Sequence, residues 1–188
     1  MAPEDCVADG RLLDESGLFD AESYRAAAGI DGGINPTQHY LSEGWRAGLD
    51  PGPNFEGQFL YPYYRSIGFL DPPALTYITL RAAGWPVYAT RAEAEPMAAV
   101  IRASDLFDAA TYKARLHLPA DLDPALHYVL VGERLGHPPS DRFDPSYYAE
   151  RYPDIAAAGM YCLGHYISNG QLEGRCPVSV ASQLAFLL

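Results

Sequence analysis

The sequence predicts an all-α protein made of repeated helix–loop–helix units, and three observations lead to that class. The chain repeats itself at an offset of 88 residues. Short segments carry helix start signals followed by glycine, and no segment shows a convincing strand pattern. Residues 12–67 match residues 100–155 without a gap. Because a fixed period is typical of stacked repeats, a residue type that recurs in every copy is interpreted first as a structural requirement.

The matched positions predict an internal duplication in which each half holds two copies. Four copies are expected, near 18–53, 55–88, 106–139 and 143–177. The second is degenerate, with Thr76-Tyr77 in place of His-Tyr and a disturbed glycine pattern around Gly84. Pairs at the offset of 88 include Ser16/Ser104, Phe19/Phe107, Asp20/Asp108, Tyr24/Tyr112, Pro36/Pro124, His39/His127, Tyr40/Tyr128, Gly44/Gly132, Gly48/Gly136 and Pro51/Pro139.

Each copy is expected to begin with a short helix whose N-cap is an aspartate. Asp20, Asp108 and Asp144 each precede a short run that ends in tyrosine, and Asp is a preferred N-cap. A second helix is expected after Asn35-Pro36, Asp71-Pro72 and Asp123-Pro124. It would end in a left-handed glycine near Gly44, Gly132 or Gly170. Helices of about 8–10 residues are marginal alone, so packing between copies must stabilise them.

A further helix is expected before each half, because residues 7–15 and 92–103 are apolar at helical spacing. The predicted organisation is a first repeat pair over 1–88, a joint over 89–99 that is not a flexible linker, and a second pair over 100–177. An apolar tail follows over 178–188. The halves would form one compact domain or two tightly packed parts.

Composition excludes several function classes. The 188 residues carry a net charge of -11, which argues against binding nucleic acid or anionic membranes. No apolar stretch approaches the ~20 residues of a membrane-spanning helix, and residues 1–18 lack a secretory signal. Three cysteines are too few for a zinc site or a disulfide framework. Cys162 and Cys176 are interpreted as free thiols, with a bridge as the alternative, and no cofactor or metal is expected.

The pattern Phe-Asp, Tyr, His-Tyr, Gly, Gly, Pro resembles a bacterial tandem repeat over roughly residues 12–177. That repeat accompanies glycosyltransferases and polysaccharide-assembly proteins, and it occurs in some large surface-associated proteins. The resemblance implies a helical repeat in a polysaccharide context. It implies no activity, because catalysis belongs to neighbouring domains of such proteins. The chain departs from the pattern in its second copy, and at Leu49 and His137, where the last copy has Arg175.

The recurring polar residues are interpreted as structural. His39, His127 and His165 could be metal ligands or general bases, but a histidine at one place in three copies favours one internal hydrogen bond made three times. We expect all three to be buried. Asp20, Asp108 and Asp144 could act as acid–base pairs, although the N-cap interpretation explains their spacing as well. No hydrolase, phosphate-loop or zinc-protease motif is present, so catalysis is not expected.

Aromatic residues outside the repeat consensus are the candidate ligand contacts. Trp45 corresponds to the polar Glu133 and Gln171, which predicts an exposed ring beside Arg46. The degenerate second copy is the preferred site, because divergence from a structural consensus can create a new surface. The alternative is that these rings form the core of an irregular repeat. The predicted ligand-binding residues are Trp45, Arg46, Tyr61, Tyr63, Trp85 and Tyr88.

These features favour a non-catalytic carbohydrate-binding module for a bacterial surface or capsular polysaccharide, such as an adhesin or spike-type receptor-binding protein. A neutral or weakly charged glycan is expected, because a strongly anionic one would be repelled unless Arg46, Arg65 or Arg81 lies close to the site. A protein-interaction scaffold and a glycan-processing enzyme are the alternatives. The chain would be made in the cytoplasm, then act beside polysaccharide synthesis or on a phage-like particle released by lysis. A protein partner or a second copy would dock on the tail through Leu184, Phe186, Leu187 and Leu188.

Overall fold

The structure, a computed structural model, describes residues 3–179 and is helical throughout. Within that range the only β-type pairing is an isolated bridge between Ser140 and Phe143, so the all-α prediction is confirmed. The proposed docking residues of the tail, Leu184 to Leu188, lie outside the described residues. Internal contacts divide the chain after Glu93 into two compact units, and each is described by itself.

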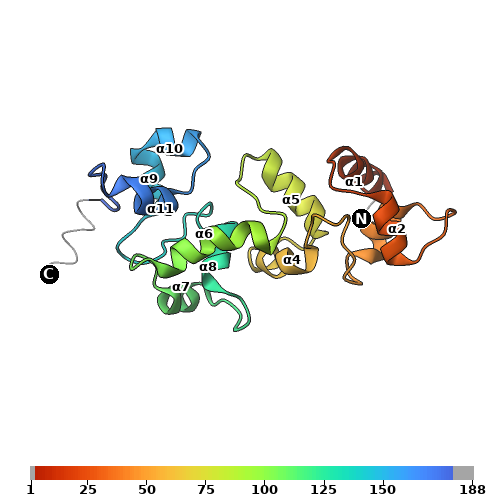
Figure 1. The fold of residues 1–188 in the computed structure, drawn as a ribbon, viewed down its shortest axis with the longest axis horizontal. Helices are drawn as coiled ribbons and strands as arrows, with labels where there is room; N and C mark the ends of the chain where they lie inside the picture. Colours follow the sequence, from red (N-terminus) through yellow and green to blue (C-terminus); the bar gives the residue numbers. More distant parts are fainter. Residues whose placement is uncertain (1–2, 180–188) are drawn as a thin grey trace. The chain divides into compact units, whose positions relative to one another are not determined.

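Unit 1 contains a leading helix followed by two helix pairs (Figure 1). Helix α1 packs against α3 and α5, α2 packs against α3, and α4 packs against α5. The second helix of the first pair continues as a single π-helical turn, η1. The elements are α1 (Pro3–Glu15), α2 (Ala21–Ala28), α3 (Pro36–His39), η1 (Tyr40–Gly44), α4 (Gly57–Ser66) and α5 (Pro73–Ala82).

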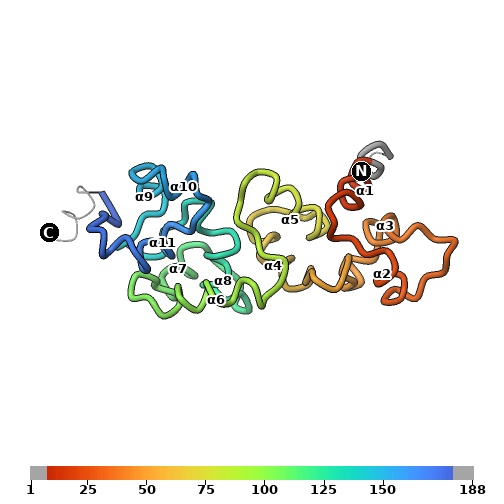
Figure 2. The backbone as a smooth tube through the Cα atoms, turned by 45° about the horizontal axis from the view of Figure 1, so that its top comes forward, coloured from red at the N-terminus to blue at the C-terminus, as the bar shows by residue number. Residues whose placement is uncertain are grey.

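Unit 2 begins within α6 and has the same order of elements, with one further short helix, α10, and one further π-helical turn, η3. Helices α9, α10 and α11 pack together, and α7 packs against α8 (Figure 2). The predicted leading helices are confirmed as α1 and α6, and α6 runs without a break through most of the expected joint. The elements are α6 (Arg91–Ala103), α7 (Ala109–Leu116), α8 (Pro124–His127), η2 (Tyr128–Gly132), α9 (Pro145–Arg151), α10 (Pro153–Ala157), α11 (Cys162–His165) and η3 (Tyr166–Gly170).

The three predicted aspartate N-caps are confirmed. Asp20 accepts hydrogen bonds from the Glu22 and Ser23 amides at 3.1 and 3.0 Å. Asp108 and Asp144 cap α7 and α9 in the same way. The donated bonds, from Ser23 above all, lower the pKa of Asp20. Because each carboxylate is committed to a helix end, the acid–base interpretation of these residues finds no support in the geometry.

A backbone hydrogen bond closes each of four segments between the cap position and a residue 31 or 33 positions later. The bonds run from Asp20 N to Pro51 O, Glu56 N to Ala89 O, Asp108 N to Pro139 O and Asp144 N to Pro177 O, at 2.9, 2.9, 3.1 and 3.0 Å. The second and fourth closures place Tyr77, and not Thr76, at the position of His165. The expected placement of Thr76-Tyr77 was therefore wrong by one residue.

Residues paired at the offset of 88 have the same aromatic neighbours. The Phe19 ring lies 5.3 Å from Tyr24 and 6.1 Å from Tyr40. The Phe107 ring lies 5.4 and 5.8 Å from their counterparts in unit 2. The local environments agree, and duplication of the complete halves stays a prediction from the sequence.

The glycines that end the second helices differ from the prediction. Gly44, Gly132 and Gly170 lie inside the π-helical turns, without positive φ. The left-handed residues come four positions later, at Gly48, Gly136 and Gly174, with φ of 87°, 72° and 68°. The helices run on because the π-turn accommodates an extra residue per turn. The glycine inside each π-helical turn makes room for a tyrosine hydroxyl.

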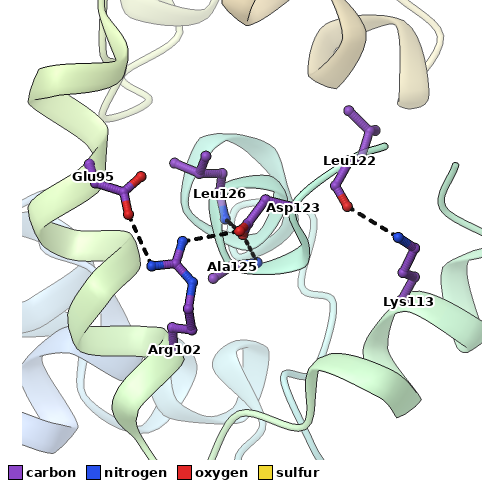
Figure 3. Close-up of polar contacts among 7 residues, drawn as sticks. All are labelled: Glu95, Arg102, Lys113, Leu122, Asp123, Ala125 and Leu126. Atoms are coloured by element: carbon purple, nitrogen blue, oxygen red, sulfur yellow. Dashed lines mark hydrogen bonds and ion pairs between the residues drawn. The ribbon is translucent and has the colours of Figure 1, made fainter. Parts of the chain in front are cut away.

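Within unit 2 an arginine ties the leading helix α6 to the start of α8, the second helix of the first pair. Arg102 on α6 forms ion pairs with Glu95, at 2.9 Å, and with Asp123, at 3.1 Å (Figure 3). Asp123 also accepts from the Ala125 and Leu126 amides at the start of α8. One carboxylate therefore caps a helix and holds its neighbour, as the packing of such short helices requires.

Candidate functional site

The same tyrosine–histidine hydrogen bond recurs in three copies. The Tyr24 hydroxyl lies 2.7 Å from His39 Nδ1. Tyr112 and His127, and Tyr148 and His165, pair in the same way at 2.9 Å. The tyrosine comes from the first helix of its copy and the histidine from the second, so the bond joins the helix pair. The predicted repeated internal hydrogen bond is confirmed.

The glycine five residues after each histidine makes room for the tyrosine of this pair. A Cβ atom built on Gly44, Gly132 or Gly170 would collide with the hydroxyl of Tyr24, Tyr112 or Tyr148 respectively. Tyrosine, histidine and glycine therefore form an interlocked set. In the second copy the whole set is absent, with Leu60, Tyr77 and Ala82 at the three positions. There α5 is a regular α-helix without the π-turn.

The three histidines differ in burial. His127 and His165 are 1% and 7% exposed, as predicted. The His39 side chain retains 17% exposure and its Nε2 lies 3.5 Å from the Glu43 carboxylate, so the expectation of burial was wrong for His39. Burial, assisted by the neighbouring His137, lowers the pKa of His127 to about 4. A buried neutral imidazole with its Nδ1 bonded to tyrosine is suited to structure more than to proton transfer.

Two of the predicted ligand residues are core residues instead. Trp45 is 5% exposed and Tyr63 is 4% exposed, so the prediction of an exposed Trp45 ring was wrong. The Trp45 ring packs edge-on against Tyr61 at 5.3 Å, and the Arg46 guanidinium covers it at 4.3 Å. Polar counterparts suggested exposure, but Glu133 is itself buried, at 7% exposure. Sequence polarity was a poor guide because that carboxylate has internal partners.

The remaining predicted contacts reach the surface of unit 1. Tyr61, Trp85 and Tyr88 are partly exposed, and Arg46 is exposed. Tyr61 lies on α4, and the other two rings lie in the segment between α5 and α6. All three rings belong to the second copy, the one without the interlocked set.

Glu133 occupies in unit 2 the position that Trp45 occupies in unit 1. Its carboxylate accepts hydrogen bonds from the Cys162 amide at 2.6 Å, the Leu163 amide at 3.1 Å and the Tyr128 hydroxyl at 2.9 Å. Burial raises the pKa of Glu133, and these three bonds oppose the shift. The carboxylate leaves beside it a cavity of about 140 Å³, lined also by Arg134, Ser146 and Met160.

Unit 1 has a larger cleft, of about 420 Å³, between the first copy and the start of the second. Leu49 and Pro53 supply apolar surface to it, and Asp50 and Glu56 supply carboxylates. Asp50 accepts from the Gly57 amide at 2.7 Å through Oδ1. Burial raises the pKa of Asp50, with a small contribution from nearby Glu56. Glu56 stands at the recurring cap position of Asp144, and Asp50 corresponds to Pro138, so the sequence pattern predicted neither acid as a ligand contact.

The described side chains include no cluster suited to metal binding. No group of three or more His, Cys, Asp or Glu side chains in this range has the geometry of a metal site. Cys162 is buried and Cys176 is exposed, both as free thiols. Burial, the largest cause, and Glu133 raise the pKa of Cys162 to about 12, so this thiol is protonated at neutral pH. None of the helices in the described range has the length and apolar character needed to cross a membrane.

The chain was compared with protein-family models, curated proteins and solved structures, and it matched none of them.

Proposed function

We propose that this chain is a non-catalytic carbohydrate-binding module that recognises a bacterial surface or capsular polysaccharide. The observation that carries the proposal is the grouping of partly exposed rings, Tyr61, Trp85 and Tyr88, in the one copy without the Tyr–His–Gly set. Rings held on short helices and turns lose little entropy on binding. They offer flat apolar faces, which suit the apolar faces of sugar rings.

The buried tryptophan has an indirect part in this proposal. Trp45 supports Tyr61 at 5.3 Å and carries Arg46 over its other surface at 4.3 Å. Substitution of Trp45 would therefore disturb Tyr61 and Arg46 without removing a direct contact. Tyr63 is withdrawn as a contact, since it is 4% exposed. The binding surface is thus reduced to Arg46, Tyr61, Trp85 and Tyr88.

The charge of the chain constrains the glycan. A net charge of -11 disfavours strongly anionic polymers. Arg46 is the one cation in the proposed set, and its guanidinium already lies against the Trp45 ring. A neutral or weakly charged polysaccharide is the ligand class that fits.

The test is a screen of purified capsular and surface polysaccharides, followed by titration of Trp85→Ala and Tyr61→Ala against any that bind. Each substitution is expected to weaken binding by about tenfold, the loss of one stacked ring. Tyr147→Ala is the matched control, since Tyr147 is a partly exposed tyrosine on α9 of the regular fourth copy. Parent-like binding by both variants, or no binding of any glycan by the parent, would refute the proposal.

A further inference from the structure

The place in unit 2 that corresponds to the cleft of unit 1 holds one of the chain's own arginines. Ala27 lines the cleft in unit 1, and at the offset of 88 the residue is Arg115. Arg115 Nη2 lies 2.8 Å from the Asp141 carboxylate and its Nη1 lies 3.3 Å from the Pro138 carbonyl oxygen. The positions that receive this guanidinium, Pro138 and Asp141, correspond to Asp50 and Pro53, which both line the cleft of unit 1.

The open cleft has acceptors and no internal cation. Among the residues that line it none is basic, and Asp50 and Glu56 are both acidic. Asp50 Oδ1 accepts a hydrogen bond from the Gly57 amide, and Glu56 Oε2 accepts one from the Arg91 amide at 2.8 Å. The second oxygen of each carboxylate has no partner among the described residues. Each is therefore free to accept a hydrogen bond from a ligand.

We propose that this cleft binds a guanidinium group, supplied by an arginine side chain in a basic segment of a partner protein. Leu49 and Pro53 would line the apolar stem of that side chain, and Asp50 and Glu56 would accept from its planar head. The surrounding charge of -11 attracts basic segments over a distance. The inference is independent of glycan binding, because the partly exposed rings Tyr61, Trp85 and Tyr88 do not line this cleft.

The ligand group that enters the cleft could be a guanidinium, another cation or a neutral polar group, and the structure favours the guanidinium. Arg115 provides the internal precedent, because the matching place in unit 2 receives a guanidinium head and not an ammonium group or a sugar hydroxyl. A planar head can approach two acceptors at once, which suits two carboxylates that line one cleft. A partner with arginine is therefore favoured over an amino sugar.

The experiment measures binding of N-acetyl-arginine methylamide to the whole chain by calorimetry and by two-dimensional NMR. The neutral isostere N-acetyl-citrulline methylamide and glucosamine are the comparison probes. The arginine probe is expected to bind about tenfold more tightly than either, with an affinity that falls as salt is added. Equal binding of citrulline, or tighter binding of glucosamine, overturns the proposal.

Ala27→Arg is the decisive variant, since it installs in unit 1 the side chain that fills the matching place in unit 2. It should weaken binding of the arginine probe by about tenfold or more. Ala26→Arg is the control, because it adds the same charge one residue away on α2, outside the cleft lining. Asp50→Asn keeps an oxygen for the Gly57 amide and removes the charge, so it should also weaken binding. Unchanged binding by Ala27→Arg and Asp50→Asn, with both variants folded, contradicts the assigned site.

Discussion

Residues 20–61 and 108–149 share the same helix caps and internal hydrogen bonds but differ in the side chains that pack beside them. Both begin with an aspartate cap, close with a backbone hydrogen bond and contain one Tyr–His–Gly set. At one position the first segment places Trp45 and the second places Glu133. At another the first has Ala27 and the second has Arg115. Residues 20–61 are packed by Trp45 at the first position and have a cleft beside Ala27 at the second. Residues 108–149 have a cavity beside Glu133 at the first position and carry Arg115 at the second.

This difference separates what holds a copy together from what gives it an individual surface. The caps, closures and Tyr–His bonds satisfy backbone and buried polar groups, so they are the same in both segments. The variable positions only have to fill or leave space beside that frame. Trp45 does so by packing, and its Nε1 has no hydrogen-bond partner among the described residues. Glu133 does so by accepting three bonds. New binding surfaces are expected at such positions.

The packing role of Trp45 is tested by Trp45→Ala. Removal of a buried tryptophan ring should cost about 3–5 kcal/mol, because transfer energy and a cavity both contribute. Trp85→Ala, at a partly exposed ring, is the control and should cost about 1 kcal/mol or less. Denaturant unfolding measures both. Similar losses for the two variants would mean that Trp45 does not carry the packing of its segment.

The polar role of Glu133 is tested by comparing Glu133→Leu with Glu133→Gln. Leucine leaves the Cys162 and Leu163 amides and the Tyr128 hydroxyl without an acceptor, at a cost of about 3 kcal/mol or more. Glutamine keeps one acceptor oxygen and should lose less. Thermal unfolding with calorimetry gives the ranking. If leucine is tolerated as well as glutamine, burial and not hydrogen bonding decides this position.

Acid should destabilise unit 2 through His127. Its pKa is lowered from 6.5 to about 4 in the folded chain. Between pH 6.5 and pH 4, His127 is therefore protonated in the unfolded state and neutral in the folded state. No stability is lost through His127 above pH 6.5; the loss grows as pH falls and amounts to about 3 kcal/mol by pH 4. His127→Gln serves as reference, since the raised pKa of Glu133 acts in the opposite sense in both proteins. A parent-to-variant difference that does not change with pH would contradict the burial argument.

The interlocked set predicts coupling between Gly132 and Tyr112. Gly132→Ala alone should cost about 1–3 kcal/mol, because the added Cβ meets the Tyr112 hydroxyl. In a Tyr112→Leu background the same change should cost less, by at least about 1 kcal/mol. That background imitates the second copy, where Leu60 and Ala82 already stand together. A double-mutant cycle measures the coupling, and strict additivity would show that the glycine has another cause.

The sequence predicted the repeated caps and hydrogen bonds more successfully than the side chains that pack beside them, and the reason is physical. Asp20 and His39 recur because they satisfy backbone and side-chain groups within one copy, and such local requirements leave a periodic signal. Trp45 and Glu133 satisfy different neighbours, so polarity at that position carried no information about burial. Gly44 was misassigned because a helix end and a close side-chain approach both select glycine. The cleft at Asp50 left no periodic signal, since Ala27 and Asp50 both differ from their counterparts Arg115 and Pro138.

The smallest stability effect in this comparison is expected from Arg115→Ala. The Arg115–Asp141 pair is largely solvated, with the two side chains 35% and 66% exposed, so its loss should cost about 1 kcal/mol or less. The same change empties the place that corresponds to the cleft of unit 1. The arginine probe should then find a second, weaker site, because Asp141 is present there but a proline stands at the position of Asp50. NMR shifts on addition of the arginine probe, confined to residues near Asp141, would report this second site. Ala26→Arg, which retains Arg115, is the reference and should show no such shifts. An absence of new shifts would mean that Asp50, and not the vacated space, makes the first cleft a binding site.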